Sequence, residues 1–248
     1  MPKDMTGELR KALFGRSSVF MGSMETPTER IVYHIIHNAL LSGETVAWVC
    51  VKDSPGSIFA KFSSYELPLE KLEDRLWFVD ATMMGDNPAL QNTLRCISLD
   101  YVCVTMHIIE ILKNHPKLLV MLDNIGIMAA LGRIDTIVRF IKFVDLKIRP
   151  AGGGIVTLLS YNAIPGSAES ELVSLMDTLI LVEEENIRAH VGSREINIPF
   201  CFSGSELILG SGDIENDLNE LFCLTVEEKK KLELEVAKKA DFYKELID

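Results

Sequence analysis

The sequence predicts a single α/β domain built on a mostly parallel sheet. Short apolar, β-branched runs alternate with longer helical stretches, which is typical of βαβ units. The run Leu-Leu-Val-Met-Leu at 118–122 is continuously apolar instead of alternating, as expected of a strand buried on both faces. The chain has 248 residues, 48% of them hydrophobic, so it can bury a core without disulfides or metals.

The strands and helices of this sheet follow in order along the chain. Six segments are predicted as parallel strands: Ser18–Gly22, Thr45–Val51, Leu76–Asp80, Leu118–Asp123, Gly154–Ser160 and Thr178–Glu183. Five helices are expected between them: Pro27–Leu41, Gly56–Ser63, Ala89–Asn114, Arg133–Ile148 and Ser167–Leu175.

After Glu183 the segments become shorter and turn residues separate them. We expect antiparallel strands here at one edge of the sheet: Ile187–Val191, Arg194–Pro199 and Glu206–Leu209. A last helix is predicted from Val226 to Leu246, opened by a capping box of Thr225 and Glu228. The domain prediction is therefore one unit over 1–248, with an N-terminal arm at 1–16 and a C-terminal helix at 225–248.

Composition excludes several classes of partner. The net charge of −11 argues against nucleic-acid binding, since affinity for phosphate backbones depends on clustered Lys and Arg. The basic run at 229–231 is interleaved with glutamates and is interpreted as a solvated helix face. The sequence shows no secretory signal and no apolar run of roughly 20 residues, which predicts a soluble cytoplasmic protein without a membrane partner.

Five cysteines stand in mostly apolar surroundings without a CxxC pair: Cys50, Cys96, Cys103, Cys201 and Cys223. We expect them to be free, buried thiols of a reducing compartment. A zinc site would need ligand pairs at short spacing, and the sequence offers none, so no metal is predicted. His34 and His37 could share a metal on the first helix, but nothing at a suitable spacing completes a site. A partly exposed helical pair is the favoured interpretation.

The first strand, loop and helix, at 19–31, resemble the phosphate loop of RecA/KaiC-like ATPases. Four further segments resemble the same superfamily: the second strand with its acidic Ser-Pro turn at 43–55, the third strand at 76–81, a Walker B strand ending at Asp123, and a late strand at 175–181. The resemblance covers roughly residues 5 to 210 and points to an archaeal family. It implies a RecA-like three-layer sandwich with antiparallel strands at the C-terminal edge and a C-terminal helix.

The phosphate loop itself departs from the working pattern. Glycine N–H groups, a lysine and a hydroxyl normally hold the phosphates and magnesium. Here only Gly22 remains, Glu25 and Pro27 take later glycine positions, Thr28 stands in place of the lysine and Glu29 in place of the hydroxyl. These changes remove donors and add like charge, so we expect no nucleotide cofactor and no ATPase activity.

The same residues are good helix starters. Thr26 suits the N-cap, Pro27 the first helical position, and Glu29 the third, which completes a capping box. In this interpretation, side chains replace the phosphate at the positive end of the helix dipole.

Four other charged residues remain as candidates for a ligand site. The resemblance implies a pair of glutamates after the second strand, where this chain has Lys52 and Asp53. Asp123 keeps the Walker B position, although a lone acid at a strand end is common at the switch point of open sheets. Lys52, Asp53, Asp123 and Arg30 are therefore the residues that an unconventional nucleotide site would use.

Two functions follow from this pattern. The first is a non-catalytic protein that binds a peptide or partner protein and forms homo-oligomers, with the segment 9–14 as a docking arm and the late strands as an edge for β-addition. The alternative is a nucleotide-binding ATPase or sensor. No catalytic residue is predicted under the first hypothesis.

Overall fold

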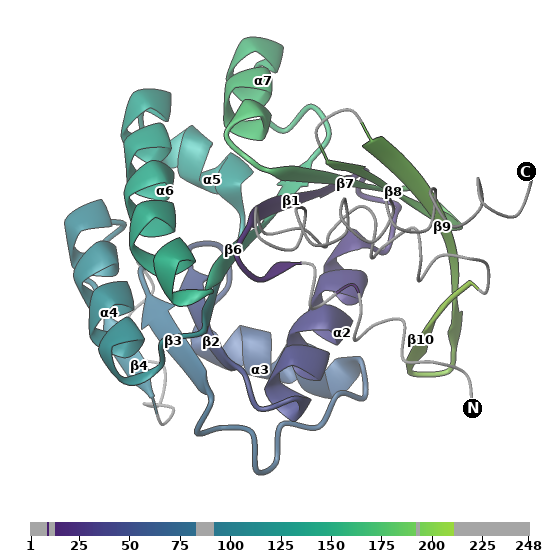
Figure 1. Cartoon of the computed structure of the whole chain (residues 1–248), viewed down its shortest axis with the longest axis horizontal. Helices are drawn as coiled ribbons and strands as arrows, with labels where there is room; N and C mark the ends of the chain where they lie inside the picture. Colours follow the sequence, from purple (N-terminus) through teal and green to yellow (C-terminus); the bar gives the residue numbers. More distant parts are fainter. Residues whose placement is uncertain (1–8, 10–12, 83–91, 192–193, 211–248) are drawn as a thin grey trace, which may run out of the picture.

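A ten-stranded mixed sheet runs through the described part of the chain, with helices on both of its faces (Figure 1). The computed structural model describes Leu9 and residues 13–82, 92–191 and 194–210. The strand order is β10-β9-β8-β7-β1-β6-β5-β2-β3-β4. Pairing is parallel from β7 through to β4, and antiparallel from β7 to β10. The predicted α/β class and mostly parallel sheet are thus confirmed, with the antiparallel strands at one edge.

The strands are β1 (Ser17–Gly22), β2 (Thr45–Cys50), β3 (Leu76–Asp80), β4 (Thr93–Arg95), β5 (Leu118–Leu122), β6 (Gly154–Ser160), β7 (Thr178–Val182), β8 (Asn186–Val191), β9 (Arg194–Ser203) and β10 (Glu206–Leu209). The helices are α2 (Thr28–Leu41), α3 (Pro55–Ser64), α4 (Tyr101–Asn114), α5 (Ile125–Leu131), α6 (Ile134–Ile148) and α7 (Gly166–Ser174), with a 3-10 turn at Arg149–Ala151.

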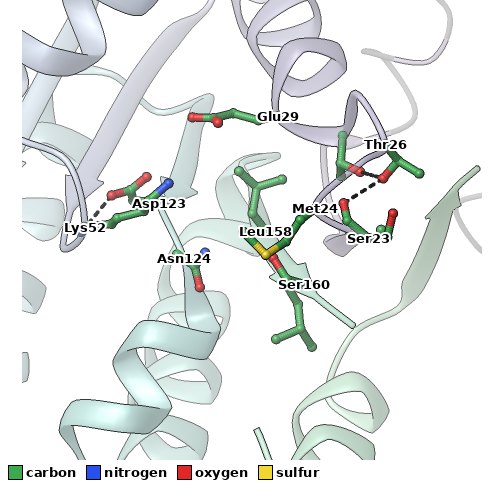
Figure 2. A pocket seen from close by; sticks show the side chains of 12 residues that line it. Ser23, Met24, Thr26, Glu29, Lys52, Asp123, Asn124, Leu158 and Ser160 are labelled. Carbon is green, nitrogen blue, oxygen red and sulfur yellow. Dashed lines mark hydrogen bonds between the residues drawn. The ribbon is translucent and has the colours of Figure 1, made fainter. Parts of the chain in front are cut away.

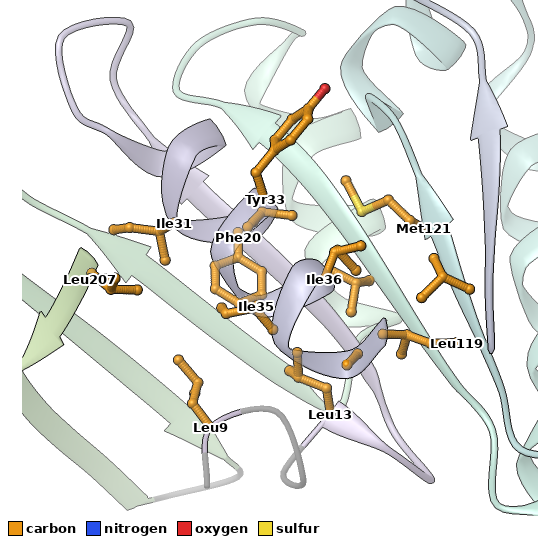
Figure 3. Packing of buried hydrophobic residues seen from close by; sticks show 14 of the residues in the cluster. Leu9, Leu13, Phe20, Ile31, Tyr33, Ile35, Ile36, Leu119, Met121 and Leu207 are labelled. Atoms are coloured by element: carbon orange, nitrogen blue, oxygen red, sulfur yellow. The ribbon is translucent and has the colours of Figure 1, made fainter. Parts of the chain in front are cut away.

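The sheet separates two apolar cores. Helices α2 and α3 cover one face together with the antiparallel strands, and α4, α5, α6 and α7 cover the other. The continuous apolar sequence of β5 has its physical reason here, since all five of its residues are buried between the two helical layers. Figure 3 shows the first core around α2, where Ile31, Ile35 and Ile36 lie against Phe20 of β1.

The start of the chain belongs to this first core. Leu9 and Leu13 are fully buried in it and lie below α2 (Figure 3). A Cβ on Gly154 would overlap the carbonyl oxygen of Leu13, which explains a glycine where β6 begins. The glycines at 152–154 form a turn from helix to strand, as the sequence indicates, and Gly152 adopts φ +80°.

One predicted helix is wrong in its first half. The segment Ala89–Asn114 is not a single helix, because it contains the short edge strand β4 before α4 begins. Asp100 explains that start, since its carboxylate accepts a hydrogen bond from the Val102 N–H (2.9 Å). The sequence interpretation also missed α5, which is capped by the Asn124 side chain.

The predicted C-terminal helix, its capping box and the basic run at 229–231 lie outside the described residues. Within the described helices, none combines the length and apolar character needed to cross a bilayer.

Candidate functional site

A pocket of about 200 Å³ lies where the carboxyl ends of four neighbouring parallel strands meet. We call it the central pocket. It is lined by Gly22 at the end of β1, Lys52 after β2, Asp123 and Asn124 after β5, and Leu158, Leu159 and Ser160 of β6, together with Ser23, Met24, Thr26, Thr28 and Glu29 (Figure 2). This is the position at which open α/β sheets bind ligands. The structure thus brings together most of the candidates selected from sequence: Gly22, Thr28, Glu29, Lys52 and Asp123.

The loop between β1 and α2 is filled by its own side chains. The Thr26 hydroxyl donates to the Ser23 carbonyl and accepts from the Thr28 hydroxyl, both at 2.9 Å. A Cβ on Gly22 would overlap both threonine oxygens, so only glycine allows this close approach. The threonines occupy space directly above the end of β1.

The predicted capping box at the start of α2 is wrong. Pro27, not Thr26, is the N-cap residue, and no side chain caps the helix there. Thr26 turns back into the loop, and Glu29 forms a salt bridge elsewhere. Glu29 does not cap the helix because its carboxylate pairs with the ammonium of Lys61, which lies 32 residues later. A charged ammonium binds a carboxylate more strongly than a neutral helix N–H does.

A closed charge cluster borders the central pocket. The Lys61 ammonium of α3 donates to Glu29 and to Asp53 Oδ2, the latter at 2.7 Å. Lys52 lies 3.7 Å from the same Asp53 oxygen. Burial acts to lower the pKa of Lys61, but the bonds to Asp53 and Glu29 outweigh it and leave the pKa raised. The Asp53 carboxylate therefore pairs with two lysines of its own chain.

Lys61 was missed by sequence reasoning, and the signal for it is weak. It stands two turns into a helix whose start is clear, since Ser54 caps α3 by accepting from the Ser57 N–H. Asp53 precedes Lys61 by eight residues, about two helical turns, and this spacing could have indicated their contact. Nothing in the sequence relates Lys61 to Glu29.

Asp123 supports a turn instead of offering an open carboxylate. Its Oδ2 accepts hydrogen bonds from the backbone N–H groups of Lys52 and Asp53, at 2.8 and 2.9 Å. The residue is only 4% exposed. Burial raises the pKa of Asp123, and the two N–H donors partly offset that rise. This geometry fixes the turn after β2 to the end of β5.

Arg30 points away from the central pocket. Its guanidinium carbon lies 3.9 Å from the ring centre of Phe202, and Nη2 donates to the Gly204 carbonyl (2.6 Å). The structure therefore separates Arg30 from Lys52 and Asp123. An unconventional site would have to work without this arginine.

A second, larger hollow lies beside the antiparallel strands. We call it the edge hollow. It measures about 450 Å³ and is lined by Pro27, Glu184, Glu185, Asn186, Pro199, Phe200, Cys201 and Phe202. Glu184 and Glu185 are exposed, and neither carboxylate forms an ion pair with another described residue. The hollow thus combines aromatic side chains with free negative charge.

His34 and His37 are buried, so the predicted partly exposed pair is wrong. His37 Nε2 lies 2.8 Å from the Pro68 carbonyl, and the His34 ring centre lies 5.5 Å from that of Phe202. Burial, Arg30 and His37 lower the pKa of His34 to about 4. The pair is buried because this side of α2 faces Phe202 of β9 at His34 and the loop between α3 and β3 at His37.

The cysteine and arm predictions also need correction. Cys96 and Cys103 form a disulfide across the loop between β4 and α4, with Cα atoms 6.0 Å apart, because the chain reverses there. Cys50 is free and buried, Cys201 is free and exposed, and Cys223 lies outside the described residues.

Leu9 and Leu13 are covered by their own domain, so these two side chains offer no apolar face to a neighbour.

Comparison with known proteins adds no family. A scan against models of protein families finds no match to this chain, and a search of curated proteins finds no similar sequence.

Proposed function

We propose that this chain is a non-catalytic relative of the RecA/KaiC-like ATPases that binds an extended peptide or partner protein and assembles with copies of itself. One observation carries the proposal: the chain's own side chains occupy the place where a phosphate would sit. Thr26 and Thr28 close over Gly22, and Glu29 lines what remains of the space.

Size and charge both oppose a nucleotide in the central pocket. Its volume of about 200 Å³ is smaller than the roughly 300–1,000 Å³ typical of small-molecule sites. Lys61 is held by Glu29 and Asp53, so it would have to abandon both carboxylates to neutralise a phosphate. A triphosphate would meet those two carboxylates instead.

The peptide site is assigned to β10 and the edge hollow. Among the described residues β10 pairs only with β9. The Gly210 N–H donates to the Pro199 carbonyl, and the alternation of an antiparallel ladder then turns the N–H groups of Leu207 and Leu209 outward. An extended peptide can pair with those groups as an added strand. Ile208, 41% exposed, and the carboxylate of Glu206 flank that edge.

Selection from a random peptide library tests this site. We expect enrichment of extended sequences that alternate apolar with Lys or Arg residues, since Glu206 lies on β10 and Glu184 and Glu185 line the edge hollow. Ile208→Glu should weaken the selected peptides by about tenfold, through loss of an apolar contact and added charge. The control is Leu131→Glu, a more exposed apolar residue at the end of α5. Peptides that bind Ile208→Glu as well as wild type would refute the assignment.

Self-assembly is assigned to an exposed apolar patch at the start of α4. Ile97, Val102 and Met106 are 102, 68 and 66% exposed, and the last two lie one helical turn apart. Sedimentation over a concentration series should show association that the double variant V102K/M106K abolishes. A wild-type chain that stays monomeric at high concentration would remove this part of the proposal.

The competing function is binding of a nucleotide, and one observation favours it. Helix α2 starts without a side-chain cap beside Lys52, which leaves the positive end of its dipole toward the central pocket. Calorimetry with ATP and ADP, with and without magnesium, decides between the two. Micromolar affinity would establish the competing function, and no heat at millimolar ligand would eliminate it.

A further inference from the structure

Two cysteines and a histidine, side chains that commonly bind zinc, lie beside β4, at the other edge of the sheet from β10. Cys96 follows that strand, and Cys103 and His107 lie on α4. One ligand atom from each residue falls within 4.8 Å of the other two. Spacing along the chain explains part of this, since Cys103 and His107 are four residues apart and share one face of the helix. The remaining ligand is brought in by the chain reversal between β4 and α4.

The imidazole of His107 is oriented for a metal. Its Nε2 lies 3.4 Å from the Arg95 carbonyl oxygen, and Cys103 Sγ lies 4.0 Å from that same oxygen, so Nε2 and this sulfur share one side of the ring. Nδ1 lies 3.4 Å from Glu110 Oε2 on the other side. A carboxylate behind the non-coordinating nitrogen is the usual support of a zinc-bound histidine. Both contacts of the ring are long for hydrogen bonds, so the ring is free to turn by a small amount.

Cys96 and His107 differ in how far solvent reaches them. Cys96 is 6% exposed, and its N–H is held by the Asp80 carbonyl at 2.8 Å. The His107 side chain is 23% exposed, which leaves an approach from solvent. A zinc ion with Zn–S bonds of about 2.3 Å places two sulfurs about 3.8 Å apart in a tetrahedron, a separation that small side-chain rotations can supply once the disulfide is open.

We propose that Cys96, Cys103 and His107 form a redox-controlled Zn²⁺ site, empty while the disulfide is closed and available after reduction. Reduction by a phosphine breaks the S–S bond and gives two thiols, with the phosphine taking oxygen from water. Zn²⁺ then displaces the two thiol protons and binds two thiolates and His107 Nε2, with water as fourth ligand. A peroxide reverses the process: two thiolates give two electrons to H₂O₂, which takes up two protons and leaves as two waters, while the disulfide forms and Zn²⁺ is released.

The proposal does not depend on the central pocket, the edge hollow or any peptide ligand. It differs from the sequence-based prediction of no metal, which considered only ligand pairs at short spacing. Cys96 and Cys103 are seven residues apart, and the fold supplies the proximity that the sequence does not show.

The experiment titrates the reduced, untagged full chain with Zn²⁺ in competition with a chromophoric chelator, and repeats it with Co²⁺. We expect one equivalent of metal and a thiolate-to-cobalt charge-transfer band, both lost in Cys103→Ser and in the oxidised protein. His107→Gln should lose at least tenfold in affinity, and Glu110→Gln about tenfold. Controls are Cys201→Ser, an exposed free thiol, and His190→Gln on β8, and both should bind like wild type.

A second measurement covers the case in which a variant does not fold. Zn²⁺ should protect Cys96 and Cys103 of the reduced wild-type chain from alkylation, mapped by peptide mass, while Cys201 stays reactive. Equal alkylation of Cys96 and Cys103 with and without Zn²⁺ would overturn the proposal. So would a reduced wild-type chain whose zinc affinity matches that of the C96S/C103S variant.

Discussion

The central pocket and the edge hollow both border the loop from Gly22 to Thr28, yet their acidic side chains differ in their partners. In the central pocket each acid has a partner from the same chain: Glu29 and Asp53 bind Lys61, and Asp123 binds two backbone N–H groups. In the edge hollow, Glu184 and Glu185 have no ion-pair partner among the described residues.

This difference indicates where binding free energy is available. A ligand in the central pocket would have to break existing bonds before making its own, whereas a cation in the edge hollow would meet carboxylates that form no ion pair with another described residue. A pocket at the usual ligand position of an open α/β sheet is therefore not by itself free to accept a ligand. Four predictions test the contrast, from the largest expected effect to the smallest.

The largest effect is expected at Asp123. Asp123→Ala should lower the free energy of unfolding by about 3 kcal/mol, because the N–H groups of Lys52 and Asp53 lose the buried carboxylate that accepts their hydrogen bonds. Asp123→Asn keeps an acceptor oxygen and removes a buried charge, so it should cost less than about 1 kcal/mol. Urea denaturation measures both. Equal losses in the two variants would mean that the charge, and not the turn, is what Asp123 provides.

His34 should make the fold sensitive to acid. The folded pKa of about 4 lies below the unfolded value of about 6.5, so between these pH values the unfolded chain binds a proton that the folded chain does not. His34 therefore contributes stability above pH 6.5 that is lost as the pH falls toward 4, up to about 3 kcal/mol. Burial lowers this pKa most, followed by the charges of Arg30 and His37.

His34→Phe provides the comparison for that prediction. Thermal unfolding of wild type and variant should diverge between pH 6.5 and 4, with the variant losing less stability. Parallel pH profiles would show that His34 is protonated in the folded state. His190→Phe, at a half-buried histidine of β8, is the control for replacing a histidine by an aromatic side chain elsewhere in the fold.

Gly22→Ala tests whether the first loop is full. We expect a loss of about 1–2 kcal/mol, since the added methyl group must displace the Thr26 and Thr28 hydroxyls. The same change in a T26S/T28A background should cost about half as much, measured as a double-mutant cycle by urea denaturation. Additive losses would show that the threonines do not fill this space.

The smallest effect on stability is expected at the edge hollow. E184Q/E185Q should change the free energy of unfolding by less than about 0.5 kcal/mol, because the side chains are exposed and form no ion pair within the described part of the chain. Its affinity for a selected Lys-containing peptide should fall about fivefold at low salt, with little difference at high salt. Fluorescence anisotropy measures this, with Glu171→Gln on α7 as control. Unchanged affinity would remove the edge hollow from the peptide site.

Most strands could be predicted from sequence, because a buried parallel strand needs an uninterrupted apolar run. Leu76–Asp80 and Gly154–Ser160 match the structure residue for residue. The exception is β4, whose three residues at an edge carry no such pattern. The candidate site was predicted in its position, since carboxyl ends of parallel strands meet at one edge, and in most of its lining residues.

The sequence by itself determined the alternation of strands and helices and the absence of a conventional phosphate-loop motif. Only the tertiary structure decided the partners: Lys61 with Glu29, Arg30 with Phe202, and Cys96 with Cys103. The physical reason is that local patterns follow from backbone periodicity over a few residues, whereas ion pairs and disulfides depend on distances that exist only once the sheet has brought remote segments together.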